Sequence, residues 1–370
     1  MASPTATSMN VYDCRHRGSS ARGMKGVEID GRWVGEGAPA FLIAEMSANH
    51  DRDLDQALAL VDIAADAGFD ALKVQTYSAD SLTLRSNHPS GRLDPTRGAG
   101  NLYDFYCKVA MPMEFHAPLF ARARERGLVA FTTVYDPRDL DFAEDLGNPI
   151  YKIASFELSH FPLLAEVART KRPIILSTGM ATLGEVEEAL EVIDRHCGGP
   201  AVLMHCCSAY PTPPEAANLD AITTLKHAFG LPVGFSDHTI GTHIALAAVM
   251  RGACAVEKHY TNDSTRAGPD HSFSATPDVL NQMVVHIRSC EAAIGDGRKL
   301  VQPAEAERAI RRRSIYVVRD LSPGEPIGEG DVRAVRPGAG LHPRYLSKII
   351  GRTAKTALRA GWPLSWDDLA

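Results

Sequence analysis

Eight short, almost entirely apolar runs alternate with longer amphipathic segments between Phe41 and Ile294. Apolar residues recur at helical spacing in the longer segments, whereas the short runs are typical of strands that are buried on both faces. Eight strand–helix units of this size predict a (β/α)8 TIM barrel rather than an open doubly wound sheet, and no GxGxxG motif follows the first run. The predicted strands are Phe41–Glu45, Ala71–Tyr77, Val129–Val134, Ile150–Ser155, Ile174–Thr178, Ala201–Cys206, Val233–Thr239 and Ala253–Tyr260.

The pattern changes on both sides of the predicted barrel. Residues 1–26 carry no core pattern, and we expect them to form a flexible N-terminal tail. Residues 27–296 should form the barrel domain, which opens with a small hairpin. A charged linker is expected at 297–313. Short β-branched runs and Pro-Gly turn pairs in 314–370 then predict a separate small, β-rich domain.

Net charge, hydrophobic run length and cysteine content indicate which partners and which cellular compartment to expect. The net charge of −6 and the pI near 6.2 argue against nucleic acid as the main partner. No apolar run approaches the roughly 18 residues that a membrane-spanning helix needs. The seven cysteines are odd in number and include no CxxC pair, which is typical of the reducing cytosol. We therefore expect a cytoplasmic protein that binds neither nucleic acid nor membrane.

Two predicted strands, the seventh and the eighth, each reach a histidine near their ends. Strand side chains alternate, so Glu257 and His259 share a face, as do Ser236 and His238. Two imidazoles on adjacent strand ends with a carboxylate beside one are compatible with a divalent-metal or acid/base site. Two structural histidines bonded to backbone carbonyls would give the same pattern, so these residues alone leave both readings open.

Further polar residues gather at the carboxyl ends of the predicted strands, where barrel enzymes place their chemistry. Lys73 and Lys152 are the most informative, because a buried lysine is rare without a partner. With several hydroxyl groups around the same mouth, two lysines predict a phosphate or carboxylate ligand. We therefore expect a site for an anionic, phosphorylated small molecule together with a divalent cation.

Several motifs occur in order along the chain. In the predicted barrel they are Ala44-Glu-Met-Ser-Ala-Asn-His50, Lys73-Val-Gln-Thr-Tyr77, Tyr151-Lys-Ile-Ala-Ser155, Ser177-Thr-Gly-Met180, Ser236-Asp-His-Thr239, Glu257-Lys-His259 and Gly268-Pro-Asp270. They resemble the sialic acid synthase family, which makes nonulosonic acids from phosphoenolpyruvate and an aldose. Arg336-Pro-Gly and Gly340-Leu-His-Pro-Arg-Tyr345 resemble the family's C-terminal antifreeze-like (SAF) domain. The first motif and Leu102-Tyr-Asp-Phe-Tyr106 are similar to the pseudaminic acid synthase branch.

The resemblance implies condensation of phosphoenolpyruvate with a six-carbon 2-acetamido aldose, giving a nine-carbon acid and phosphate by C–O cleavage. His238 and His259 would hold Mn²⁺, with Mg²⁺ or Co²⁺ as alternatives. Phosphoenolpyruvate would contact Lys73, Thr133, Lys152, Ser155, Ser177, Ser208 and Ser236. The sugar would contact Glu45, Gln75, Tyr210, Asp270 and Arg336. The catalytic residues would be Glu45, Glu157, His238, Glu257 and His259.

The resemblance also implies a domain-swapped homodimer, in which Arg336 of one chain contacts the sugar bound in the barrel of the other. Three segments depart from the family's usual pattern: Asn49-His50-Asp51-Arg52, Thr261–Ala267 and Ala275-Thr276-Pro277. Thr261–Ala267 is expected close to the sugar, so the resemblance leaves the identity of the aldose open.

Other functions remain open. The product could be N-acetylneuraminate, legionaminate or another ulosonic acid. A Schiff-base aldolase using Lys152 or Lys73 is the nearest different chemistry. An amidohydrolase-type barrel is disfavoured because the first strand ends in Glu45 rather than a His-x-His pair. A catalytically inactive barrel that acts as a scaffold is disfavoured, because nearly all the polar residues expected of an active site are present at the carboxyl ends of the predicted strands.

Overall fold

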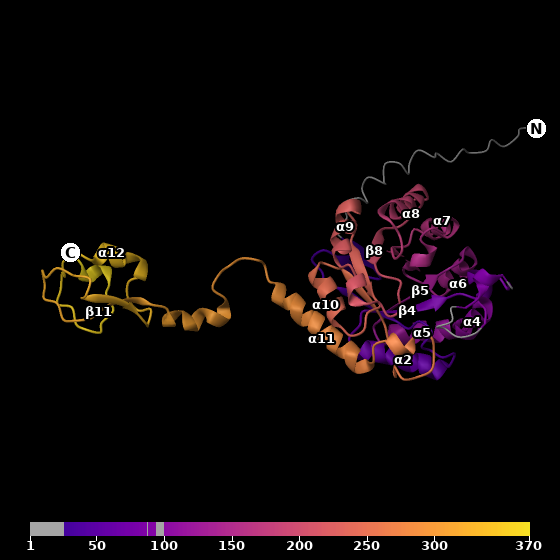
Figure 1. Ribbon diagram of the computed structural model, residues 1–370, viewed down its shortest axis with the longest axis horizontal. Coiled ribbons are helices and arrows are strands. Elements are labelled where there is room, and N and C mark those ends of the chain that lie inside the picture. Colours follow the sequence, from indigo (N-terminus) through magenta and orange to yellow (C-terminus); the bar gives the residue numbers. More distant parts are fainter. Residues whose placement is uncertain (1–25, 87, 94–99) are drawn as a thin grey trace, which may run out of the picture. The chain divides into compact units, whose positions relative to one another are not determined.

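The computed structural model describes residues 26–86, 88–93 and 100–370, so the predicted tail lies outside the described residues except for Gly26. The chain divides into two compact units, the first ending at Ile294 and the second comprising Gly295–Ala370 (Figure 1). Each unit has its own hydrophobic core.

Eight parallel strands of the first unit close into a barrel in the order β10-β3-β4-β5-β6-β7-β8-β9, which confirms the predicted fold. Their bounds are β3 Phe41–Glu45, β4 Ala71–Thr76, β5 Val129–Val134, β6 Tyr151–Ile153, β7 Ile174–Ser177, β8 Ala201–His205, β9 Val233–Asp237 and β10 Ala255–His259. The register places Glu45 beside both His259 and Lys73, and Thr133 beside Lys152. The polar strand ends predicted from the sequence are therefore neighbours around one end of the barrel.

Helices surround the barrel wall (Figure 1). Alternating with the strands are α2 Leu54–Asp66, α5 Met113–Glu125, α6 Leu140–Asp145, α7 Phe161–Arg169, α8 Leu183–Arg195, α9 Asp220–Phe229, α10 His243–Met250 and α11 Pro277–Ile294. Two shorter helices, α3 Ala79–Leu82 and α4 Leu102–Val109, occupy the polar excursion after β4. In α2 the buried positions Ala57, Leu60, Val61 and Ala64 follow helical spacing, so one face packs on the strands.

The interior of the barrel is apolar at its amino end. Ile43, Phe131, Ile175 and Met204 point inward there and belong to one buried cluster. The same cluster includes residues of the hairpin formed by β1 Gly26–Ile29 and β2 Arg32–Gly35, which therefore packs against this end. Because the amino end is filled with apolar side chains, polar ligands have access to the interior from the carboxyl end of the strands.

The second unit contains a two-stranded antiparallel sheet of β11 Ser314–Val317 and β12 Val332–Val335, with the short helix α12 Leu346–Ile349. Its small core includes Ile315, Ile327 and Leu364. Such a unit of short strands and turns agrees with the predicted β-rich character.

Among the described residues, no helix is long and apolar enough to cross a membrane. Five of the described cysteines are free thiols: Cys107, Cys206, Cys207, Cys254 and Cys290.

Candidate active site

A cluster of four buried charged side chains lies inside the barrel near its carboxyl end. Lys73 Nζ lies 2.9 Å from Glu45 Oε2 and 3.3 Å from Glu257 Oε1. Lys152 Nζ lies 2.7 Å from the other oxygen of Glu257. Two lysines thus face two carboxylates, and the formal charge of the cluster is zero when all four groups are ionised.

The pKa values of the four groups are shifted in different directions. Burial raises the pKa of Glu45 in spite of the nearby Lys73. For Glu257, burial is outweighed by Lys152 and Lys73, which hold its pKa well below the usual range. Burial lowers the pKa of Lys152, whereas for Lys73 the two carboxylates outweigh burial and raise the pKa. Lys73 and Glu257 are therefore the firmly ionised pair, while Lys152 lacks enough negative charge to compensate fully for its burial.

Hydroxyl and amide groups extend the cluster along the barrel wall. Lys73 Nζ donates to Thr133 Oγ1 at 3.1 Å, and Ser236 Oγ donates to Glu257 at 3.1 Å. Gln75 Nε2 donates to Glu45 Oε1 at 2.6 Å. All three come from inward-facing positions, as strand alternation predicts.

His238 and His259 are neighbouring imidazoles whose ring centroids are 5.4 Å apart. Burial lowers the pKa of each, and for His259 the presence of His238 lowers it further, so both rings are neutral. His238 Nδ1 lies 2.8 Å from the carbonyl oxygen of Cys207 and must donate to it, which leaves the lone pair on Nε2. His259 Nδ1 is buried without a hydrogen-bond partner among the described residues. Each ring therefore offers an unprotonated nitrogen or an unused polar atom at this site.

This pair of histidines fits the predicted metal, because neutral imidazole is a common metal ligand and a buried ring nitrogen without a partner is costly. No group of three or more His, Cys, Asp or Glu side chains among the described residues is arranged to hold a metal ion. Two histidines would leave the remaining coordination positions to water and substrate oxygens, as in catalytic rather than structural sites.

The hydroxyl groups of Ser155 and Ser208 approach each other across Gly179. Ser155 Oγ accepts a hydrogen bond from the Gly179 amide at 3.0 Å and lies 3.2 Å from Cys206 Sγ. A Cβ atom at Gly179 would lie 2.5 Å from Ser208 Oγ and 2.8 Å from Ser155 Oγ. The glycine is therefore required by close packing. Ser177 is also buried and, two residues after Ile175, faces the barrel interior.

Glu157 lies on the short 3-10 helix Ser155–Glu157, beyond the end of β6. Its Oε2 atom is buried without a hydrogen-bond partner among the described residues. Burial raises the pKa of Glu157 to about 7. The pKa of the nearby half-buried Tyr135 is raised by desolvation and, in addition, by the charge of Glu157. A carboxylic acid that exchanges its proton near neutral pH is suited to general acid–base chemistry.

The residues predicted for the sugar fall into two groups. Glu45, Gln75, Tyr210 and Asp270 belong to the first unit; the Tyr210 ring lies 4.3 Å from that of His238, and Asp270 accepts a hydrogen bond from Ser47. Arg336 belongs to the second unit, where it is exposed, and its guanidinium makes no hydrogen bond or ion pair with the described residues of the chain.

Comparison with known proteins identifies the family. The model of the NeuB family matches residues 60–299, and that of the SAF domain matches residues 312–370. The chain belongs to the NeuB family. Membership makes it an enzyme of the phosphoenolpyruvate-dependent nonulosonic acid synthase family, as the sequence motifs predict.

NeuB-family relatives cover nearly the whole chain. A pseudaminic acid synthase of Helicobacter pylori is 37% identical over 90% of this chain and 98% of its own. An N,N'-diacetyllegionaminic acid synthase of Campylobacter jejuni is also 37% identical, over 85% of this chain and 95% of its own. The solved N-acetylneuraminic acid synthetase of Leptospira borgpetersenii is 32% identical, with a TM-score of 0.68 over 76% of this chain and 94% of its own.

Some site residues of this NeuB enzyme were missed by the sequence analysis. Ser47 and Phe273 contact Asp270 and His259, respectively, but both lie in loops whose positions strand alternation does not predict. Cys206 faces Ser155 inside the barrel, whereas the preceding His205 faces outward. Strand alternation from Met204 could have assigned both residues to their faces.

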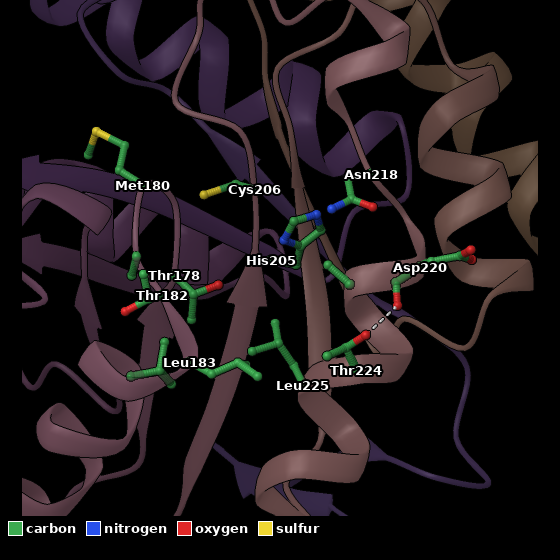
Figure 2. A pocket seen from close by; sticks show the side chains of 13 residues that line it. Thr178, Met180, Thr182, Leu183, His205, Cys206, Asn218, Asp220, Thr224 and Leu225 are labelled. Atoms are coloured by element: carbon green, nitrogen blue, oxygen red, sulfur yellow. Dashed lines mark hydrogen bonds between the residues drawn. The ribbon is translucent and has the colours of Figure 1, made fainter.

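A second, separate cavity of about 360 Å³ lies outside the barrel wall, between the first turns of α8 and α9 (Figure 2). Its lining includes Thr182, His205 and Asp220. None of the four charged residues of the cluster lines it, but Cys206, whose sulfur lies 3.2 Å from Ser155 Oγ, does.

Replacing Gly179 tests the serine arrangement. Gly179→Ala should raise KM for phosphoenolpyruvate about tenfold, because the added Cβ displaces the Ser155 and Ser208 hydroxyls, while the chain still folds since both are side-chain ends. Gly184→Ala is the matched control, as the nearest atom to its Cβ is 3.9 Å away. Steady-state kinetics would contradict the prediction if the two variants had the same KM for phosphoenolpyruvate.

Proposed function

We propose that the chain is a pseudaminic acid synthase, which condenses phosphoenolpyruvate with a 2,4-diacetamido-trideoxy-altrose and releases phosphate by C–O cleavage. The observation that carries the proposal is the Lys73–Glu257–Lys152 arrangement beside two neutral histidines inside the barrel. The Ala44–His50 motif, similar to that of the pseudaminic acid branch, favours this product. The equal identity to a legionaminic acid synthase makes that activity the main alternative.

Electrostatics supports phosphoenolpyruvate as the ligand of the lysines. The substrate carries roughly −2.5 to −3 charge at neutral pH, whereas the cluster around Glu257 is formally neutral. Burial lowers the pKa of Lys152, so the nearby carboxylate does not fully stabilise the charged form of this lysine. An anionic phosphate or carboxylate beside Lys152 would supply further negative charge, with Thr133, Ser155, Ser177, Ser208 and Ser236 as hydroxyl donors.

We propose His238 and His259 as the ligands of a divalent cation, Mn²⁺ first and Mg²⁺ or Co²⁺ as alternatives. The cation would supply Lewis-acid polarisation of the aldehyde oxygen of the open-chain sugar. It would also add the positive charge that the neutral cluster lacks for binding a substrate of this charge.

The reaction needs two bonds to form and one to break. C3 of phosphoenolpyruvate forms a carbon–carbon bond with the aldehyde carbon, whose oxygen is protonated to a hydroxyl group. Water adds at C2 and loses a proton. The tetrahedral intermediate then expels phosphate by cleavage of the bond between C2 and the phosphate oxygen, while the new C2 hydroxyl group loses its proton and becomes the keto group of the product. Lys73 and Lys152 would stabilise the charge on the departing phosphate. Glu157, with a pKa of about 7, is suited to accept or return a proton in these steps.

For the sugar we propose contacts with Glu45 of the cluster and with Gln75, Tyr210 and Asp270, which together offer carboxylate, amide and hydroxyl groups. Glu257 and Glu45 would orient the lysines in addition to any contact with substrate. We further propose a cytoplasmic, domain-swapped homodimer in which Arg336 of one chain completes the sugar site of the other. Its exposure on the SAF unit leaves the guanidinium accessible for this contact.

Phosphate release from phosphoenolpyruvate tests the proposal. With Mn²⁺ and a panel of aldoses, release should occur only with the 2,4-diacetamido-trideoxy-altrose, and EDTA should abolish it. The other aldoses are N-acetylmannosamine, the manno-configured diacetamido analogue and plain mannose. Release with the manno-configured analogue would instead indicate a legionaminic acid synthase, and release with N-acetylmannosamine an N-acetylneuraminate synthase.

One observation favours a Schiff-base aldolase as a second candidate, because the lowered pKa of Lys152 is what an imine-forming lysine requires. Borohydride trapping with pyruvate distinguishes the two. A covalent adduct on Lys152, together with activity that survives EDTA, would overturn the synthase proposal.

Titration of Glu157 gives a prediction for stability. Its folded-state pKa of about 7 lies above the unfolded value, so the folded form loses stability as pH rises from about 4.5 to about 7. Glu157→Gln lacks this ionisation and should be more stable than the parent by about 1–3 kcal/mol at pH 8, with little difference at pH 4.5. Glu187→Gln, at an exposed position of α8, is the control. Urea unfolding at both pH values would refute the assignment if the parent and Glu157→Gln changed in parallel.

A further inference from the structure

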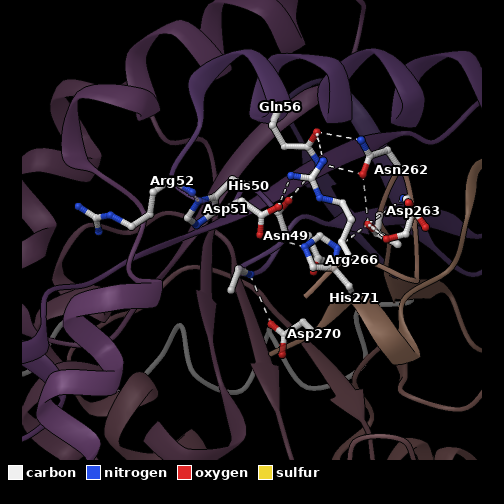
Figure 3. A network of polar contacts seen from close by, with 12 residues as sticks. Asn49, His50, Asp51, Arg52, Gln56, Asn262, Asp263, Arg266, Asp270 and His271 are labelled. Carbon is white, nitrogen blue, oxygen red and sulfur yellow. Dashed lines mark hydrogen bonds and ion pairs between the residues drawn. The ribbon is translucent and has the colours of Figure 1, made fainter. Parts of the chain in front are cut away.

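Two of the segments that depart from the family pattern, residues 49–52 and 261–267, are joined by an ion pair, and His271 beyond the second segment contacts the same carboxylate. Asp51 Oδ2 lies 2.6 Å from Arg266 Nη2, and Asp51 Oδ1 lies 2.9 Å from His271 Nε2. Figure 3 shows Asp51 between the two basic side chains. The loop after β3 is therefore tied to the loop after β10 through one carboxylate, and both its oxygens are used.

Further hydrogen bonds extend this contact into a network. The amide of Gln56 exchanges hydrogen bonds of 2.9 and 2.8 Å with that of Asn262, and Arg266 Nη1 donates to Gln56 Oε1 at 3.4 Å. His271 Nδ1 lies 2.7 Å from Thr261 Oγ1 (Figure 3). We refer to Asp51, Arg266 and His271 as the loop clamp. Its members come from segments more than 200 residues apart, so it fixes tertiary rather than local structure.

The loop after β3 needs such support because its backbone is strained. Ser47, Asp51 and Arg52 all have positive φ, of 49°, 50° and 57°. Non-glycine residues in this region each cost about 1 kcal/mol or more, and such conformations persist only where the surroundings hold them. The His271 ring is also closely packed, since a Cβ atom at Gly268 would lie 2.6 Å from it.

The loop clamp holds residues that face the proposed sugar site. Asp270 immediately precedes His271, and its carboxylate accepts hydrogen bonds from the Ser47 hydroxyl and from the Ala48 amide at 3.4 Å. Ser47 Oγ in turn lies 3.4 Å from Gln75 Nε2, which donates to Glu45. Displacement of either loop would therefore move the Ser47–Asp270 pair relative to Gln75 and Glu45, while Lys73 and Lys152 on their strands would stay in place.

We propose that the loop clamp positions Ser47 and Asp270 for the hydroxyl and acetamido groups of the aldose, and so helps determine which aldose is accepted. This inference rests on the proposed function and adds the residues that set its sugar specificity. Asp51, Arg266 and His271 act as positioning residues, because they reach the sugar through Ser47 and Asp270 rather than directly.

Kinetics of the full-length enzyme with its best aldose tests the proposal. Arg266→Met and Asp51→Asn should each raise KM for the aldose about tenfold and leave KM for phosphoenolpyruvate within about twofold. The double variant should be no worse than the poorer single one, because both changes break the same pair. Arg266→Lys should recover part of the loss. Ser264→Ala is the control and should behave as the parent, because Ser264 lies in the same loop and its side chain makes no hydrogen bond to the clamp within the described part of the chain.

The outcomes separate this proposal from the proposed function. If the parent releases phosphate with an aldose and Arg266→Met leaves its KM unchanged, the loop clamp proposal is wrong and the synthase proposal stands. If KM rises for both substrates together, the loop clamp stabilises the whole barrel rather than the sugar site. The proposal that it determines sugar specificity is wrong in that case. If the parent uses no aldose of the panel, the proposed function itself fails. A changed order of preference among the aldoses in Arg266→Met would support the specificity role directly.

Discussion

The burial of four charged side chains inside a barrel is the constraint on which the site depends. Glu45, Lys73, Lys152 and Glu257 occupy inward-facing positions at the carboxyl ends of their strands, above a layer of apolar side chains. Isolated charges there would be strongly disfavoured, so each is paired, and the cluster as a whole is neutral. A cluster of this kind can accept an anion only if compensating charge arrives with it, or if its internal pairs rearrange. Both neutral histidines lie where such a cation could be held.

Strand alternation explains why so much of this site can be predicted. Once the eight strands are located, every second residue faces inward, so Lys73 and Gln75, Glu257 and His259 fall together without any knowledge of the loops. The closed order of strands then makes distant residues neighbours: Lys152 and Glu257 meet across the interior although they are separated by 105 positions in the chain. Several of the family motifs in the barrel contain these inward-facing strand ends.

The contacts made by loop residues could not be predicted from the sequence pattern. Nothing in the spacing of Ser47 indicates its hydrogen bond to Asp270, because the contact depends on a left-handed backbone at Ser47 itself. The buried, unpaired oxygen of Glu157 and the crowding around Gly179 depend on packing that no periodicity encodes. Arg336 is predicted only through the family resemblance, because its proposed role requires a second chain that strand alternation cannot indicate. The departures at 49–52 and 261–267 are visible in the sequence, but only the structure brings them into contact through Asp51 and Arg266.

We propose that a neutral lysine–carboxylate cluster and a histidine-held cation together bind phosphoenolpyruvate. Calorimetric titration of the full-length enzyme with phosphoenolpyruvate, in the presence and absence of Mn²⁺ and without sugar, tests it most directly. Phosphoenolpyruvate should bind at least about tenfold tighter with Mn²⁺ than without it. By thermodynamic reciprocity, Mn²⁺ should bind tighter by the same factor when phosphoenolpyruvate is present. Equal affinity under both conditions would contradict it, because the lysines alone would then provide all the charge that the substrate requires.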